Sequence, residues 1–355
     1  MDEIMLDHVR RYPRMQVQDA VKLLYQREYG NGHMITDEED SLFRLNTEYS
    51  QMIKKADFDS PLSCDPIGGG YVRVHLGSLP EGLSLETLNR IFIRSAQDAA
   101  GSREQFANSL EELKREAGAG NLPWSLHEVE AYLNDYTRQA DPVVSHTHEF
   151  RSFYHPAYRV ISQRYADYLP VYAEIDSLLL AKEKKEETVL IAIDGPCASG
   201  KTTLGYLLKN VYDANLFHMD DFFLRPEQRT AERFAEVGGN VDYERFMREV
   251  LEPLKARRDF GYRRYDCGRQ RLVEEIYVAV KPLNIVEGVY SRHPYFEDPY
   301  DLTYCLKIGS EEQQRRILAR NGKDMLKRFL EDWIPKENRY LAMFDVNNDN
   351  YKNYL

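Results

Sequence analysis

The sequence predicts an α/β fold with a parallel sheet for residues 188–355, preceded by a mainly α-helical α+β domain. From residue 188 onward, short apolar runs alternate with helical patterns, which is typical of a parallel sheet flanked by helices. Before that point, apolar residues recur mostly at helical spacing. The chain has 355 residues, more than one core usually holds, so we expect two domains.

A run of charged residues marks the expected boundary. Residues 182–187 read Lys-Glu-Lys-Lys-Glu-Glu and stand directly before the first long apolar run. Such a run is either a solvated linker or the end of a helix. We therefore expect one domain at 1–181, for which the sequence indicates no task, and a second domain at 188–355.

The first domain is predicted to be mostly helical. Apolar residues have clear helical spacing at 17–24 and 42–52. Residues 157–180 predict one long helix, kinked at Pro170 because proline cannot donate the backbone hydrogen bond of a helix interior. Residues 71–76, Tyr-Val-Arg-Val-His-Leu, alternate as a short half-buried strand does.

The second domain is predicted to be built on a central parallel strand at 189–193, where every residue is apolar. Continuous apolar runs are typical of strands covered on both faces. A helix is expected next at 204–211, and further strands at 215–219, 283–286 and 302–308.

The turn between the first strand and its helix carries a phosphate-binding sequence, Gly-x-x-x-x-Gly-Lys-Thr, known as a P-loop. Its glycines allow backbone N–H groups to turn toward phosphates, and the helix that follows adds its N-terminal N–H groups. Lys201 is expected to reach the β- and γ-phosphates, and Thr202 to bind magnesium. The residues expected to contact ATP or GTP are Gly195, Ala198, Ser199, Gly200, Lys201, Thr202 and Thr203.

Carboxylates follow two further strands of the predicted sheet. Asp220 and Asp221 come directly after the second strand, and Glu287 after the third. The carboxyl ends of parallel strands meet at one edge, so these groups should lie near the phosphates. Asp220 either acts as a base toward an acceptor hydroxyl or, with Asp221, only caps a turn. Glu287 either binds magnesium through water or, like Asp194, only holds the loop in shape.

These elements, in this order, resemble the uridine kinase and nicotinamide riboside kinase family, over about residues 187–345. The resemblance is carried by the P-loop, by Asp-Asp-Phe-Phe at 220–223, by Arg-Pro-Glu at 225–227, and by the stretches at 240–246, 265–266, 286–290 and 315–320.

The resemblance implies a role for individual residues. Asp220 corresponds to the catalytic base, and the arginine-rich helix to a lid whose guanidinium groups spread positive charge over the phosphoryl oxygens. The implied catalytic residues are Asp220, Lys201, Arg316 and Arg320, with Arg315 on ATP. The implied substrate residues are Asp221, Phe223, Asp242, Tyr265 and Arg271, and the implied magnesium residues are Thr202 and Glu287.

One departure from that family concerns the acceptor. Uridine kinases carry a histidine a few residues after their Tyr-Asp element, used in nucleoside recognition, and none follows Tyr265-Asp266 here. Arginines surround this element instead. They form either a solvated hairpin face or a site for an acceptor that carries a phosphate or carboxylate.

Several histidines of the first domain stand beside glycine, tyrosine or arginine: His33, His75, His146, His148 and His155. If residues 146–148 are extended, two of these rings face one side, as a metal pair requires, but no third ligand has a characteristic spacing. The alternatives are hydrogen-bonded structural histidines, or a polar pocket for an anionic ligand that includes Arg73, Arg151 and Arg159.

The composition limits the classes of binding partner that we expect for this protein. A formal net charge of -11 disfavours a nucleic acid, no apolar run is long enough to span a bilayer, and the N-terminus lacks a signal-peptide pattern. Four scattered cysteines fit free thiols in the cytoplasm. The oligomeric state stays open, a homo-oligomer included.

The sequence therefore predicts a cytoplasmic kinase that uses ATP or GTP and Mg²⁺ to phosphorylate a hydroxyl of a small metabolite, most simply a nucleoside-like acceptor. Three alternatives stay open: a regulatory switch that hydrolyses nucleotide, a polynucleotide or tRNA kinase, and a bifunctional protein whose first domain has its own activity.

Overall fold

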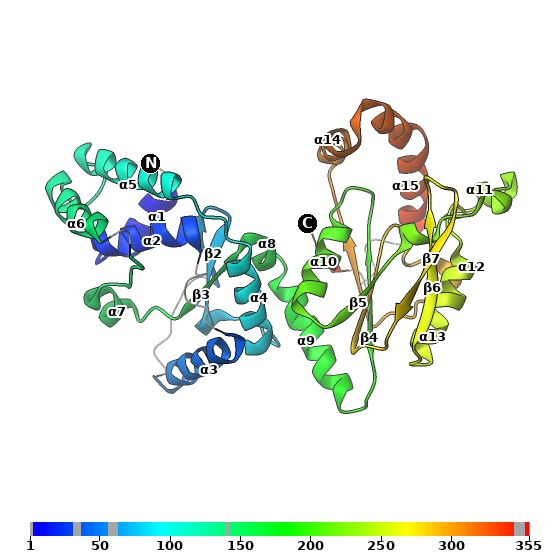
Figure 1. The fold of residues 1–355 in the computed structure, drawn as a ribbon, viewed down its shortest axis with the longest axis horizontal. Coiled ribbons are helices and arrows are strands. Elements are labelled where there is room, and N and C mark those ends of the chain that lie inside the picture. The colour runs from blue at the N-terminus through cyan, green and yellow to red at the C-terminus, as the bar shows by residue number, and fades with distance from the viewer. Residues whose placement is uncertain (1–2, 31–36, 56–62, 140–141, 344–351, 355) are drawn as a thin grey trace. The chain divides into compact units, whose positions relative to one another are not determined.

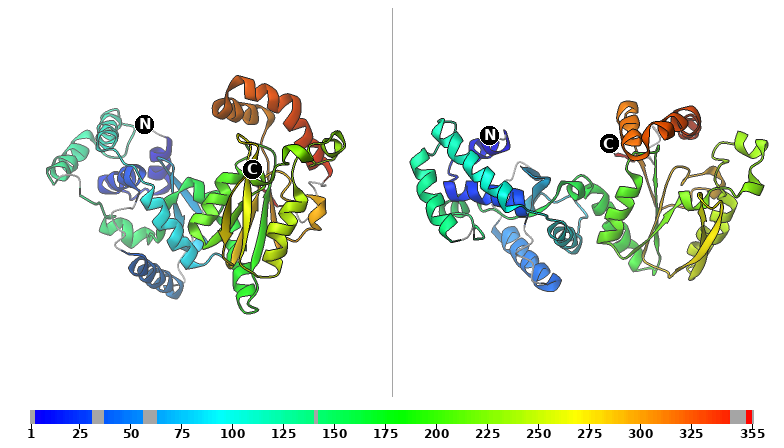
Figure 2. Two further views of the ribbon diagram at one scale, coloured as in Figure 1. Left: turned by 45° about the vertical axis from the view of Figure 1, so that its right-hand side comes forward. Right: turned by 45° about the horizontal axis from the view of Figure 1, so that its top comes forward.

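The computed structural model describes residues 3–30, 37–55, 63–139, 142–343 and 352–354. The chain divides into two compact units, Met1–Ser177 and Leu178–Leu355, which can be followed by colour in Figures 1 and 2. The division falls inside helix α9 (Leu169–Glu183), whose last residues begin the charge run. In the part of the chain with described coordinates, no helix is long and apolar enough to cross a membrane.

The first unit packs helices around a three-stranded antiparallel sheet with the order β1-β2-β3. Its strands are β1 (Cys64–Gly68), β2 (Tyr71–His75) and β3 (Tyr158–Ser162). Its helices are α1 (Glu3–Arg11), α2 (Val17–Tyr29), α3 (Glu38–Lys55), α4 (Leu85–Gln97), α5 (Arg103–Gly118), α6 (Leu126–Arg138), α7 (His148–Tyr154) and α8 (Gln163–Ala166). The core forms where apolar faces of these helices meet, with Leu23, Phe106 and Val129 almost fully buried.

The predicted long helix at 157–180 is wrong in its first half. Residues Tyr158–Ser162 form strand β3, which pairs with β2 along its whole length. The β-branched Val160 and Ile161 favour a strand, and the edge of β2 needs a hydrogen-bonding partner. Pro170 lies at the second residue of α9, in the first helical turn where a missing N–H leaves no hydrogen bond unmade, so it begins a helix and does not kink one.

The second unit confirms the predicted α/β fold. Five parallel strands stand in the order β10-β9-β4-β8-β5. They are β4 (Val189–Asp194), β5 (Ala214–His218), β8 (Leu283–Glu287), β9 (Leu302–Leu306) and β10 (Lys352–Tyr354). Every residue of β4 and β8 is buried, as the continuous apolar run at 189–193 predicted for a central strand.

Helices and a hairpin surround this sheet. Helix α10 (Lys201–Val211) packs on β4, β5 and β8, and the antiparallel hairpin of β6 (Phe260–Asp266) and β7 (Arg271–Val278) forms a separate small sheet. The remaining elements are α11 (Ala231–Ala235), α12 (Tyr243–Phe246), α13 (Glu252–Lys255), α14 (Ser310–Arg328) and α15 (Ile334–Met343), with a 3₁₀ turn at Met219–Phe222 after β5. Since β4, β5, β8 and β9 run in parallel, their carboxyl ends form one edge, and the candidate site is built there.

Candidate active site

The P-loop runs from the end of β4 into α10, and its glycines take a backbone conformation that other residues avoid. Gly195 has a φ of 134° and Gly200 a φ of 104°. A Cβ at Gly195 would lie 2.4 Å from the carbonyl oxygen of Leu306 on β9, so only glycine fits there. Lys201 is buried, and its Nζ donates to the carbonyl oxygen of Pro196 at 2.8 Å. The ammonium group therefore lies inside the loop, where phosphate oxygens would bind.

Other groups of the loop fit a phosphate as well. The hydroxyl of Ser199 is buried and has no hydrogen-bond partner among the described residues, an arrangement that costs free energy unless a ligand oxygen satisfies it. Ala198 has a φ of 61°, which turns the backbone inward just before it. Thr203 lies exposed in the first turn of α10, beside the N–H groups of the helix N-terminus.

Asp194, which the sequence did indicate, and three side chains that it did not, namely Gln313, Glu337 and Tyr340, hold the loop in place. Asp194, at the end of β4, accepts from the Gly195 N–H at 2.6 Å and from the hydroxyl of Tyr340 at 2.6 Å. Glu337 accepts from the backbone N–H of Cys197 at 2.8 Å, and Gln313 donates to the carbonyl oxygen of Cys197 at 3.0 Å. Helices α14 and α15 thereby fasten the backbone of the loop from outside.

The only sign in the sequence that α15 would contact the loop was the spacing of two of its residues. Glu337 and Tyr340 are three residues apart, so they share one face of α15. Their partners lie 140 and 146 residues earlier in the chain, a separation that no local pattern reveals. Both oxygens of Asp194 accept hydrogen bonds from protein groups, which agrees with a role in shaping the loop.

Thr202, His218 and Glu287 meet where β5, β8 and α10 come together. The hydroxyl of Thr202 donates to Oε1 of Glu287 at 3.1 Å, and Nδ1 of His218 lies 2.5 Å from the same oxygen. The hydrogen bond to Glu287 raises the pKa of His218. His218 is a neighbour of the site that the sequence interpretation missed, although it directly precedes the Met-Asp-Asp turn.

The residues at this point fit a magnesium ion. Mg²⁺ prefers oxygen ligands and usually takes one or two from the protein, the rest from phosphates and water. The hydroxyl of Thr202 and the carboxylate of Glu287 supply such oxygens beside the P-loop. Over the described stretches of the chain, no group of three His, Cys, Asp or Glu side chains could hold a metal ion.

Asp220 lies on the 3₁₀ turn after β5, at the carboxyl edge of the sheet where the P-loop also begins. Its carboxylate is open to solvent, as a group that meets a substrate must be. The surrounding protein nevertheless raises its pKa by excluding water, and the charges of Lys201 and Arg320 act in the opposite direction. The structure thus brings Asp220 within electrostatic reach of Lys201.

Two of the predicted substrate residues, Asp221 and Asp242, contact one buried arginine that the sequence interpretation overlooked. Arg245 donates to the carbonyl oxygen of Asp221 at 2.9 Å, and its Nε lies 3.6 Å from a carboxylate oxygen of Asp242. Phe223 forms an isolated antiparallel bridge with Val241. Since Asp242 also caps α12, it is held rigidly beside the Asp-Asp turn.

The other two predicted substrate residues lie on the hairpin. Tyr265 is buried, and its hydroxyl accepts from Arg229 at 2.7 Å. Arg271 is exposed at the start of β7, opposite Asp266, and within the described residues no hydrogen bond joins it to the other predicted substrate residues. The structure therefore brings Tyr265 into the packed part of the site and leaves Arg271 at its surface.

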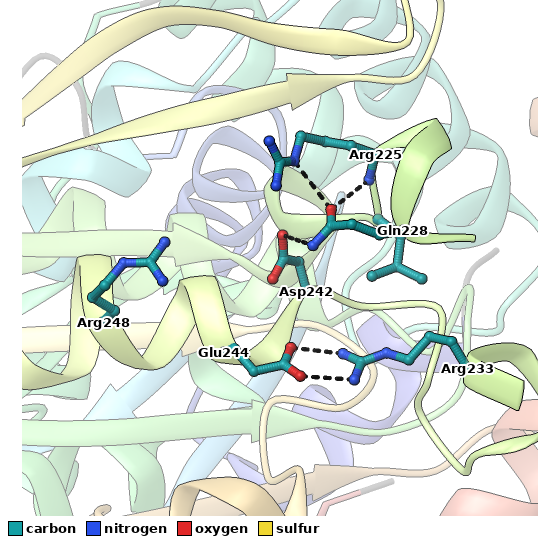
Figure 3. Close-up of a pocket in the computed structure, with 7 residues that line it drawn as sticks. Arg225, Gln228, Arg233, Asp242, Glu244 and Arg248 are labelled. Atoms are coloured by element: carbon teal, nitrogen blue, oxygen red, sulfur yellow. Dashed lines mark hydrogen bonds and ion pairs between the residues drawn. The ribbon is translucent and has the colours of Figure 1, made fainter. Parts of the chain in front are cut away.

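A pocket of about 240 Å³ opens beside Asp242 and is drawn in Figure 3. Glu244 and Arg233 close one side through two hydrogen bonds of 2.8 and 2.7 Å. Gln228 donates to Asp242 at 2.9 Å on another side. The remaining lining residues are Leu224, Arg225 and Arg248. The pocket adjoins the Asp-Asp turn, because the backbone N–H of Asp242 donates to the carbonyl oxygen of Phe222 at 2.7 Å.

The arginines of α14 take different positions. Arg316 donates to the carbonyl oxygen of Ala198 in the P-loop at 3.2 Å and to Glu312 at 2.6 Å. Arg315 is exposed and directs two hydrogen bonds of 2.6 Å at Glu312, away from the loop. Arg316 is therefore the arginine of this pair that touches the nucleotide position.

Arg320 lies further along the same helix. Its Nε donates to Asn321 at 2.8 Å, and its charge lowers the pKa of Asp220 against the larger effect of burial. The helix is interrupted directly afterwards, at Gly322, where φ is 80° and ψ is 176°. The catalytic and ATP-binding roles of these arginines stay predictions.

His146 of the first unit is held by hydrogen bonds within the protein. Both ring nitrogens of His146 have partners, Asp19 at 2.8 Å and the Tyr158 hydroxyl at 2.7 Å, so neither is left for a metal. Residues 146–148 are not an extended strand, because α7 begins at His148. The metal hypothesis for this pair is therefore wrong. His33 lies outside the described residues.

Comparison with known proteins finds similarity among solved structures. No family model and no curated protein matches the sequence. Among solved structures, one described as a possible uridine kinase from Bacillus stearothermophilus has 19% identity and a TM-score of 0.38, covering 50% of this chain and 98% of that one. A fructose transport system kinase from Silicibacter has 20% identity and a TM-score of 0.39, covering 47% and 93%. Matches of this strength do not indicate what this chain acts on.

Proposed function

We propose that the second unit is a kinase that transfers the γ-phosphoryl group of ATP or GTP to a hydroxyl of a small metabolite. The observation that carries this proposal is that the buried ammonium group of Lys201 and the exposed carboxylate of Asp220 lie at the same edge of the parallel sheet. An ammonium group inside a P-loop serves the phosphates, and a solvent-open carboxylate opposite it serves an acceptor. A protein that only hydrolyses nucleotide needs to orient water and has no need of an acceptor-side carboxylate.

The proposed reaction forms one bond and breaks one. The acceptor oxygen bonds to the γ-phosphorus, the bond from that phosphorus to the β–γ bridging oxygen breaks, and the hydroxyl proton passes to Asp220. Lys201, Arg316 and Arg320 would offset the negative charge on the transferred group. Magnesium, when bound, would neutralise charge on the β- and γ-phosphates, held by Thr202 and Glu287. Positioning would supply most of the rate, since little other covalent chemistry is required.

We further propose that the acceptor occupies the pocket beside Asp242 (Figure 3). Its volume of about 240 Å³ suits a single sugar or a molecule of similar size. Asp242 and Gln228 can bind hydroxyl groups, which favours a sugar or nucleoside-like acceptor. Arg225 and Arg248 also line the pocket, and they favour an acceptor that carries a negative group.

A screen for acceptor-dependent ADP release tests the proposal. Nucleosides, riboside precursors of cofactors, and sugar phosphates would each be offered with ATP and Mg²⁺, with the Lys201→Ala variant as the blank. ADP release that depends on one acceptor and vanishes in the blank is the expected result. If ATP is hydrolysed at a rate that no acceptor changes, the protein is a regulatory switch and not a kinase. If the protein binds RNA in a salt-dependent way, a polynucleotide kinase is favoured.

A further inference from the structure

The first unit buries two cationic side chains that no carboxylate neutralises directly. Arg73 on β2 is only 3% exposed, and both its Nε and its Nη2 donate to the amide oxygen of Gln26, at 3.1 and 2.8 Å. Lys22 on α2 is half-buried and donates to the carbonyl oxygen of Val144 at 3.0 Å. Within the described parts of the chain, neither cation has a carboxylate oxygen at ion-pair distance.

The buried carboxylates nearby are engaged elsewhere. Asp19 is fully buried and accepts from the His146 ring at 2.8 Å, and from the backbone N–H and hydroxyl of Thr147 at 3.0 and 2.8 Å. Asp65 is fully buried and paired with Arg11 at 2.5 Å. An unpaired buried charge costs free energy, and protein sites accept that cost where an ion binds.

The positive charge of these side chains shifts the pKa values of the titratable groups around them. Burial and then the like charge of Arg73 lower the pKa of Lys22 to about 8. Burial lowers the pKa of His146 to about 4, with the hydrogen bond of Asp19 opposing it and the charges of Arg73 and Lys22 adding to it. His146 is therefore neutral near pH 7: its Nδ1–H donates to Asp19, and its Nε2 accepts from the hydroxyl of Tyr158.

Two further polar side chains, Tyr158 and His75, lie in the same layer, with ring centres 6.0 Å apart. The guanidinium carbon of Arg73 lies 4.8 Å from the centre of the Tyr158 ring, and the hydroxyl of Tyr158 is also 3.4 Å from Gln26. Nε2 of His75, the last residue of β2, is buried and has no hydrogen-bond partner among the residues described. Since Lys22 and Gln26 are four residues apart on α2, they face this layer together.

We infer that this layer between α2, β2 and β3 is a binding site for the phosphate or carboxylate group of a small molecule. Arg73 and Lys22 supply the positive charge, and the ring of His75 supplies a further hydrogen bond. Asp19 fixes His146, which in turn fixes Tyr158. The site belongs to the first unit, so it is additional to the nucleotide and acceptor positions of the proposed kinase.

Hydrogen–deuterium exchange of the full chain tests this inference, because it reports binding segment by segment. Inorganic phosphate and, separately, acetate are the probes. Exchange should slow in α2 and in β2 and β3 of the wild type. Arg73→Met and Lys22→Met should each weaken that protection, raising the probe concentration needed by roughly 10-fold, since each removes a charged hydrogen-bond donor.

The control is Arg159→Met on β3, because Arg159 is already ion-paired with Glu48 at 2.7 Å. It should leave the protection unchanged. Protection by phosphate but not by acetate would indicate a phosphate site, and protection by both would indicate a general anion site.

Two results would overturn the inference. One is the absence of protection in the first unit of the wild type while phosphate protects the P-loop at 195–202, which serves as the internal positive control. The other is protection that persists unchanged in Arg73→Met or, should that variant fail to fold, in Lys22→Met. A destabilised Arg73→Met with wild-type protection would make the arginine a structural support for Gln26 only.

Discussion

Replacing Asp220 by asparagine separates the proposed kinase from a nucleotide-hydrolysing switch. Asparagine keeps the size and the hydrogen-bonding capacity of the side chain but loses the basic oxygen. Asp220 is exposed on the turn after β5, so the change should disturb no packing. Acceptor-dependent turnover should fall by about 100-fold or more, the usual contribution of a positioned general base. That factor corresponds to about 2.7 kcal/mol of transition-state stabilisation.

Nucleotide binding should respond in the opposite direction. Asp220 is a negative group in electrostatic contact with Lys201, so its charge opposes the approach of the phosphates. The affinity of Asp220→Asn for ATP should therefore equal or slightly exceed that of the wild type. Titration calorimetry with ATP, beside ADP release in the presence of an acceptor, measures both quantities.

The pH dependence of acceptor-dependent turnover provides a second test of the role of Asp220. Exclusion of water raises the pKa of Asp220, so the base becomes active above the ordinary aspartate value of 3.8. Wild-type turnover should rise with pH through the raised value, and this acid limb should be absent in Asp220→Asn. Asp221→Asn is the matched control, with the same loss of charge one residue away. Full turnover in Asp220→Asn with loss in Asp221→Asn would exchange their roles, and full turnover in both would leave the kinase without its base.

Four further results are expected. Lys201→Ala should lower phosphoryl transfer by about 100-fold or more, as removal of one transition-state donor does, and normal turnover in a folded variant would contradict the P-loop assignment. Thr202→Ala should raise the magnesium requirement, so an unchanged magnesium titration would take Thr202 out of the metal shell. Arg316→Ala should lower kcat more than ATP affinity, whereas Arg315→Ala, whose partner is Glu312, should change both less; an effect of Arg316→Ala on KM alone would make Arg316 a plain binding residue. Burial raises the pKa of Asp65, but its cationic neighbours outweigh burial and lower the pKa to about 2. The ionised carboxylate therefore stabilises the folded protein above about pH 4, and this contribution is lost as the pH falls toward 2. Asp65→Asn should therefore lose about 2 kcal/mol of unfolding free energy at neutral pH, a difference that narrows in acid; a constant difference across denaturation curves from pH 7 to about pH 3 would refute this.

The P-loop domain could be predicted because its signals are local. The apolar run at 189–193, the glycines of the loop and Lys201 lie within a few residues of one another, and each type is required by the chemistry of a phosphate-binding turn. The alternation of strands and helices after it follows from burial on both faces of a parallel sheet. Asp220 and Glu287 could be placed near the loop because parallel strands end at one edge.

The strand at Tyr158–Ser162 shows where local pattern failed. Its apolar residues fit a helical spacing as well as a strand, since the segment is short. Only the antiparallel edge of β2, more than eighty residues earlier in the chain, decided between them, by offering a ladder of backbone hydrogen bonds.

What the sequence by itself determined is a P-loop domain with the order of its phosphate-binding and carboxylate residues. The tertiary structure decided that Gln313, Glu337 and Tyr340 hold that loop in place. It also decided that Arg73 and Lys22 of the first unit have no carboxylate at ion-pair distance among the described residues. The physical reason is the same for both. Whether a polar side chain is satisfied depends on partners that folding brings from distant parts of the chain, and spacing along the sequence carries no record of them.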